Sequence, residues 1–171
     1  MGMTLKETKI GLIPEDWEAV RLGIITQVRG GNGFPLEYQG SLTGTYPFYK
    51  VLDMTLPGNE VYMQSANNYV DSHVSRELRA TIFPAQTVIF PKVGAAVYTN
   101  KKRILSCEAL IDNNVMGVTV TAVDRCLPYF LYTYFQTLDL TTVSNPGPLP
   151  SINAKRINSM EMPLPPPPRT A

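Results

Sequence analysis

The sequence contains one histidine, His73, and two cysteines, Cys107 and Cys126. These three scattered side chains cannot supply the ligands of a zinc site, so we expect no metal centre. A Ser-His-Asp triad would have to use His73, which lies in a polar stretch without a nucleophile motif. Two cysteines are too few for a disulfide framework, which favours a reducing compartment such as the cytoplasm.

Long apolar runs are also missing. The longest candidate, residues 126–135, contains Pro128 and is well short of the roughly 18 apolar residues of a membrane span. The N-terminus lacks the apolar segment of a signal peptide. No G-x-x-x-x-G-K-[ST] phosphate loop occurs, which argues against nucleotide hydrolysis. We therefore expect no membrane partner and no cofactor.

The composition is that of a globular domain. The chain has 171 residues, of which 44% are hydrophobic and only 17% charged, whereas an average domain has about 25% charged residues. This length suits one domain with a buried core. The 15 prolines disfavour long helices, because an interior proline costs a helix about 3 kcal/mol.

Periodicity predicts many short strands, a few short helices and long loops. Strands are predicted at 18–22, 46–51 (an edge strand, because of Pro47), 87–90, 95–99, 115–123 and 160–164. Helices are predicted at 23–28, 68–79, 128–138 and, capped by Ser151, at 151–157. Five glycines between residues 30 and 45 predict a loop. This order predicts an α+β domain built on a mainly antiparallel twisted sheet.

Basic residues cluster although the net charge is only +1. Residues 72–107 hold six cations against Glu77, and residues 140–171 hold three against Glu161. One basic face is enough to bind DNA phosphates, because each neutralised phosphate releases counterions. Asparagine and serine side chains near these cations can contact bases or backbone. On charge alone, an ordinary solvated basic face is favoured over DNA binding as the explanation of the pattern.

The predicted DNA-binding residues fall in the two basic segments. They are Lys92, Asn100, Lys101, Lys102, Arg103, Asn145, Ser151, Asn153, Lys155 and Arg156.

Several motifs together resemble a known family. The segments are Ile10–Gly23, Tyr46–Val51, Val88–Ala96, Asp112–Val118, Pro128–Tyr132, Pro150–Asn153 and Met162–Pro166. In this order they resemble a target recognition domain of the specificity subunit of type I restriction-modification systems. The resemblance runs from about Lys9 to Pro168.

The resemblance implies a role and partners. Such a subunit has two recognition domains joined by long helices, and each domain reads one half of a split DNA target. Methyltransferase subunits then methylate adenine, and a restriction subunit translocates and cuts. By this resemblance residues 1–164 are a single recognition domain, and residues 165–171 are a Pro-rich exit toward a spacer helix.

Catalytic motifs are missing from the chain. Asn145-Pro146-Gly147-Pro148 lacks the second proline and the aromatic residue of an adenine methyltransferase loop. Glu15, Asp16 and Glu18 cluster, but the first lysine after them is Lys50, whereas a metal-dependent nuclease needs clustered carboxylates with a lysine. We therefore expect a non-catalytic DNA-binding module. The alternative is a protein-interaction module that docks through Pro163–Pro168 as a polyproline ligand.

Overall fold

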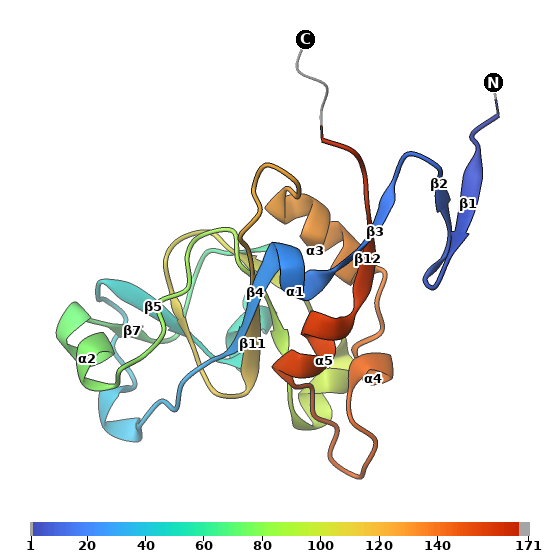
Figure 1. The fold of residues 1–171 in the computed structure, drawn as a ribbon. Coiled ribbons are helices and arrows are strands. Elements are labelled where there is room, and N and C mark those ends of the chain that lie inside the picture. The colour runs from blue at the N-terminus through green and yellow to red at the C-terminus, as the bar shows by residue number, and fades with distance from the viewer. Residues whose placement is uncertain (1, 168–171) are drawn as a thin grey trace.

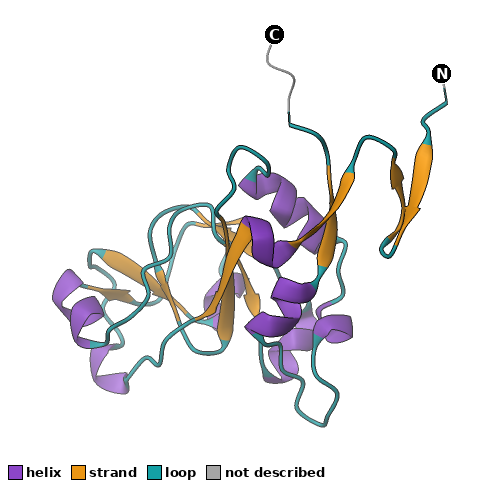
Figure 2. Cartoon of the chain, viewed as in Figure 1, coloured by secondary structure: helices purple, strands orange, loops and turns teal. Residues whose placement is uncertain are grey.

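The structure is a computed structural model that describes residues 2–167. Its strands are β1 (Leu5–Thr8), β2 (Gly11–Pro14), β3 (Glu18–Arg21), β4 (Thr26–Gly30), β5 (Tyr46–Tyr49), β6 (Tyr62–Met63), β7 (Tyr69–Val70), β8 (Val88–Pro91), β9 (Arg103–Leu105), β10 (Leu110–Ile111), β11 (Val115–Val120) and β12 (Glu161–Leu164). The α-helices are α1 (Leu22–Ile25), α2 (Ser72–Glu77), α3 (Pro128–Gln136), α4 (Leu140–Val143) and α5 (Ala154–Ser159), and the 3₁₀ helices are η1 (Leu36–Tyr38), η2 (Val51–Thr55) and η3 (Gly94–Thr99). Figure 1 shows their arrangement, and Figure 2 distinguishes helices, strands and loops.

A five-stranded sheet in the order β4-β11-β8-β9-β6 forms the centre of the molecule. Its first four strands pair antiparallel, and β6 joins β9 in parallel. The strand Val88–Pro91 is buried along its whole length. Val88 and Phe90 pack on the side of α3 and α5, whereas Ile89 packs in a second apolar cluster with Tyr49. Burial of both faces explains the continuous apolar run of this strand.

A smaller sheet, in the order β10-β5-β7, lies beside the central one. The prediction that Pro47 marks an edge strand is wrong, since β5 is the middle strand. The amide of Phe48 donates to Asn68 O, so the Pro47 nitrogen points to the other side of the strand. There β10 begins its pairing only at Phe48, and the missing N–H of proline breaks no ladder hydrogen bond.

The two ends of the domain pair with each other. β12 runs antiparallel to β3, and the β1–β2 hairpin projects from this end of the molecule (Figure 1). Trp17 packs edge-on against Phe130 of α3, with ring centroids 6.0 Å apart. The predicted α+β fold is confirmed, with two parallel strand pairs within it.

The helix predicted at 68–79 is shorter than expected, because Tyr69–Val70 form β7 and α2 covers only Ser72–Glu77. Two other predicted elements are wrong. Residues 23–28 do not form one helix, because α1 ends at Ile25 and β4 begins at Thr26. Residues 95–99 do not return as a strand but form η3, between Gly94 with φ 72° and Asn100 with φ 55°. Left-handed angles at both ends turn the chain too tightly for a strand.

Gly31 marks a close crossing of two chain segments. A Cβ atom there would lie 2.2 Å from the carbonyl oxygens of both Ile111 and Asp112. The Gly31 amide donates to Val115 O, and the next amide, of Asn32, donates to Ile111 O. The glycine-rich segment is therefore fixed against the central sheet at this point.

Candidate nucleic-acid interface

Residues 150–152 pair with residues 92–94 and bring two predicted basic segments together. The amide of Gly94 donates to Pro150 O at 2.8 Å, and that of Ile152 donates to Lys92 O at 2.7 Å. The amide of Asn145 donates to Ser151 O at 2.7 Å, and Asn145 Nδ2 lies 3.4 Å from Ser151 Oγ. Lys92, Asn145 and Ser151 are therefore neighbours although they lie far apart in the sequence.

The short helix α5 continues this surface. Asn153 is its N-cap, and its Oδ1 accepts a hydrogen bond from the Arg156 amide at 2.8 Å. The predicted cap at Ser151 is wrong, because Ser151 pairs with Val93 and Asn145 instead. Ile157 is buried beneath the helix, which leaves Lys155 and Arg156 exposed.

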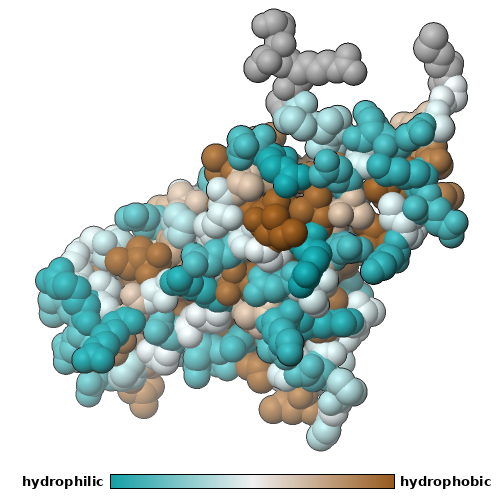
Figure 3. Space-filling view, viewed as in Figure 1, coloured by the Kyte–Doolittle hydropathy of each residue, from teal (hydrophilic) through white to brown (hydrophobic). Residues whose placement is uncertain are grey.

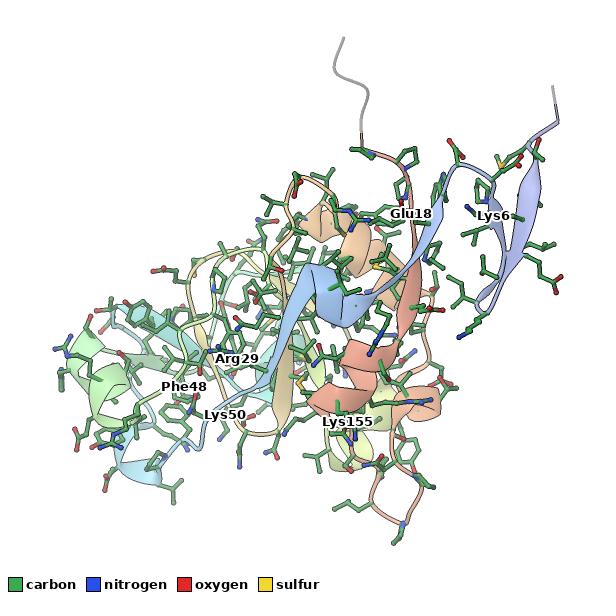
Figure 4. All side chains as sticks on the ribbon, in the orientation of Figure 1. Lys6, Glu18, Arg29, Phe48, Lys50 and Lys155 are labelled. Atoms are coloured by element: carbon green, nitrogen blue, oxygen red, sulfur yellow. The ribbon has the colours of Figure 1, made fainter. Side chains whose placement is uncertain are left out.

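We call the resulting face the 145–156 surface. It consists of Lys92, Asn145, Ser151, Asn153, Lys155 and Arg156. Within residues 2–167, the side chains of its three cations make no hydrogen bond and no ion pair. Lys92 Nζ lies next to Gly30, at the end of β4. Figure 4 shows Lys155 on α5.

Asn100 and Lys102 have a different environment. Lys102 is only 1% exposed, and its Nζ donates to Leu138 O at 2.5 Å and to Asn100 Oδ1 at 2.8 Å. The same Asn100 oxygen accepts from the Leu140 amide at 2.9 Å. Burial lowers the pKa of Lys102. We withdraw Lys102 from the predicted phosphate contacts, because its ammonium lies inside the protein.

Arg103 also turns inward. Its Nη1 donates to Lys102 O at 2.8 Å and its Nη2 to Met54 O at 3.0 Å. Its guanidinium therefore joins β9 to η2, and we withdraw it as well. Lys101, which directly precedes Lys102, is half-buried and stays a predicted phosphate contact.

Sequence patterns missed a polar groove between β4 and α5. It has a volume of about 500 Å³ and is lined by Arg21, Gly23, Ile24, Thr26, Gln27, Val28, Arg29 and Asn158. Thr26 and Val28 are buried, whereas Gln27 and Arg29 are exposed, an alternation typical of a strand. The predicted helix at 23–28 hid this signal, because a helix places these side chains on different faces.

The comparison with known families decides the identity. A model of the type I restriction modification DNA specificity domain matches residues 14–169. The chain belongs to this family. The role of a DNA specificity domain is recognition of a DNA sequence and not catalysis, as the sequence predicts.

Solved structures show that the DNA specificity domain fold is shared. The crystal structure of the HsdS subunit from Thermoanaerobacter tengcongensis matches with a TM-score of 0.66 and 16% identity. A second structure, described under the structural basis of complex assembly and conformational transition in the type I R-M system, matches with a TM-score of 0.66 and 17% identity. The S subunit of the type I system from M. genitalium matches with a TM-score of 0.56 and 10% identity.

The alignments cover most of this chain but a minor part of the others. They cover 90%, 90% and 86% of this chain, in that order. The chain spans 34%, 35% and 34% of the matched proteins.

Among residues 2–167, no group of three or more His, Cys, Asp or Glu side chains is arranged to hold a metal ion. In the same part of the chain, no helix has the length and apolar character needed to cross a bilayer.

Proposed function

We propose that this domain binds double-stranded DNA sequence-specifically and reads one half of a bipartite target. The observation that supports this most directly is the family match combined with the 145–156 surface. That surface places Lys92, Lys155 and Arg156 beside three polar side chains, and the cations have no intramolecular partners among the described residues. Phosphate contacts position a protein on the duplex, and polar side chains then specify the bases.

The hydrogen bonds within the 145–156 surface suggest different roles for its residues. Asn153 Oδ1 caps α5, so this residue positions Lys155 and Arg156 and keeps both Nδ2 donors for DNA. Asn145 and Ser151 hold each other across the loop and present their remaining groups outward. We propose that the cations bind phosphates and that Asn145 and Ser151 contact the bases or the backbone.

The partners of this domain follow from the same proposal. A methyltransferase subunit would modify the recognised DNA, and a restriction subunit would cut it. Such a role places the protein in the cytoplasm. The exposed Cys107 and the buried Cys126 are both free thiols, which agrees with a reducing compartment.

Salt dependence of DNA binding tests the proposal. Binding of the full chain to a pool of random duplexes of about 20 base pairs, two helical turns, is measured at several salt concentrations. Each phosphate contact contributes a slope of about −0.9 to log affinity against log salt. We expect K155A and R156A each to reduce the slope by about that amount. Wild-type binding that ignores salt would contradict DNA recognition through this surface.

The matched control is R125A. Arg125 is a surface cation with the same charge, but it forms an ion pair with Glu18 at 2.7 Å. This variant removes one positive charge without touching the 145–156 surface. We expect the salt slope of R125A to equal that of the wild type.

The polyproline alternative receives less support from the structure. Pro163 and Leu164 belong to β12 and pair with Ala19 and Glu18, so two of the six residues of the predicted ligand are part of a sheet. Pro165 and Pro166 line a hollow with Leu127 and Phe130. Pro168 lies outside the described residues.

A further inference from the structure

The β4–α5 groove contains only neutral and basic residues. Two of its lining residues are arginines, Arg21 and Arg29, and two are amides, Gln27 and Asn158; none is acidic. Figure 4 shows Arg29 on β4, the edge strand of the central sheet. A groove with this lining attracts an anionic ligand that also offers hydrogen-bonding groups.

The polar groups of the groove are not used within the protein. No hydrogen bond within residues 2–167 involves the side chains of Arg21, Gln27, Arg29 or Asn158. Glu161 is the cross-strand neighbour of Arg21, but the one ion pair among the described residues joins Arg125 and Glu18. By contrast, Lys102 and Arg103 are held by backbone carbonyls. The groove therefore keeps its full capacity to bind a ligand.

The groove is continuous with the 145–156 surface. Asn158 lines the groove one helical turn after Lys155, and residues three apart on a helix lie on the same face. At the other end, Lys92 Nζ lies next to Gly30, but residues 30 and 29 of β4 face opposite sides of the strand, so the continuity rests on α5. A ligand on the 145–156 surface can thus extend over α5 and along β4.

An exposed apolar side chain lies within the same groove. Ile24 is 64% exposed, and Figure 3 shows an apolar patch over α1 in the middle of the face turned to the viewer. The thymine methyl group in the major groove is bound through apolar contacts of this kind. Cations, amides and one apolar side chain together match what duplex DNA presents.

We infer that bound DNA extends from the 145–156 surface into the β4–α5 groove, where Arg21 and Arg29 bind phosphates and Gln27 and Asn158 contact base edges. This inference rests on the proposed function and adds specificity-determining residues to it. The favoured ligand is DNA and not a protein segment, because the groove has cations without carboxylates and its amides are unpaired.

The first test measures the phosphate contacts. R21A and R29A of the full chain are titrated with the same random duplex pool, with R125A as the control. We expect the salt slope of R21A and of R29A to fall by about 0.9 each, and that of R125A to match the wild type. Thermal unfolding verifies that each variant folds, since exposed substitutions usually change stability by about 0.5 kcal/mol or less.

The outcomes separate the two proposals. If K155A and R156A lower the slope while R21A and R29A do not, the groove inference is wrong and the proposed function stands. If the wild type shows no salt-dependent binding, both are wrong. If R21A and R29A keep full DNA binding but abolish binding of a methyltransferase subunit, the groove is a protein interface.

The second test measures base contacts. Duplexes bound by wild type, Q27A and N158A are selected from the random pool and sequenced. Loss of a bidentate base contact lowers discrimination at that position roughly 5- to 150-fold. We expect each variant to lose preference at one or two positions while the salt slope stays constant. The same preferences in both variants and the wild type, or no preference in the wild type, would rule out base contacts by these amides.

Discussion

The buried Lys102 donates from Nζ to Asn100 Oδ1 at 2.8 Å, and the two residues together join the η3–β9 turn to the end of α3 and the start of α4. Lys102 donates to Leu138 O, and Asn100 accepts from the Leu140 amide. A lysine in a basic run of the sequence thus has a structural function. Its ammonium satisfies a carbonyl that follows a helix, where a cation also interacts favourably with the helix dipole.

This arrangement predicts that K102M destabilises the domain without changing DNA binding. Methionine has a similar length but leaves Leu138 O without its donor, which costs about 1–3 kcal/mol. The measurement is urea unfolding, combined with the salt slope of DNA binding. K101M is the matched control: its stability should stay within about 0.5 kcal/mol of the wild type. A K102M variant with wild-type stability and a smaller salt slope would return Lys102 to the phosphate contacts.

Asn153 provides a second prediction. Removing its cap in N153A leaves the Arg156 amide without its acceptor, which costs about 1 kcal/mol. Because α5 has only six residues, fraying of its first turn should also loosen Lys155 and Arg156 and weaken DNA binding. N153S restores a cap and should recover stability. If N153S also recovers affinity, the cap positions the cations; if affinity stays low, the amide itself contacts DNA.

The sequence predicted most elements with strong periodicity or clear end signals. Examples are α3, which begins at Pro128, and the buried strand β8. The failures have physical causes. The helix η3 ends with the cap residue Asn100, whose backbone is left-handed. The helix predicted at 23–28 contains the end of α1 at Ile25 and the start of β4 at Thr26, so two elements share six residues. Of the predicted site residues, Lys155 and Arg156 are exposed, but the sequence did not indicate the inward direction of Lys102 and Arg103. Side-chain direction there depends on distant carbonyls, at Leu138 and Met54, that a local pattern does not contain.

Gly31 predicts a sharp contrast between neighbouring glycines. G31A places a methyl group against two backbone carbonyls, and such overpacking costs about 1–3 kcal/mol or more. At Gly33 a Cβ atom meets nothing within 4 Å, so G33A should remain within about 0.5 kcal/mol of the wild type. Thermal unfolding of both variants tests this. Equal stability of the two would mean that the crossing at Gly31 relaxes easily.

Asp112 predicts a dependence of stability on pH. Burial raises its pKa above the ordinary 3.8, although its carboxylate accepts from the Asn114 amide. Below pH 3.8 the group is protonated in both states. As pH rises from there through the raised folded pKa, the native state holds more protons than the unfolded one, so stability falls. D112N keeps an acceptor oxygen without the charge, so the stability of this variant should not fall in this way as pH rises.

Asp139 supplies a control of opposite sign. Hydrogen bonds from Thr141 lower its pKa below 3.8, so its contribution is present above pH 3.8 and is lost as pH falls through the lowered folded pKa. The free energy of unfolding is measured by urea titration of wild type, D112N and D139N at pH 3 and pH 7. Relative to the wild type, D112N should gain stability on going to pH 7, and D139N should lose it. A D112N variant that loses stability at pH 7 would mean that the nearby Lys50 outweighs burial and stabilises the Asp112 carboxylate.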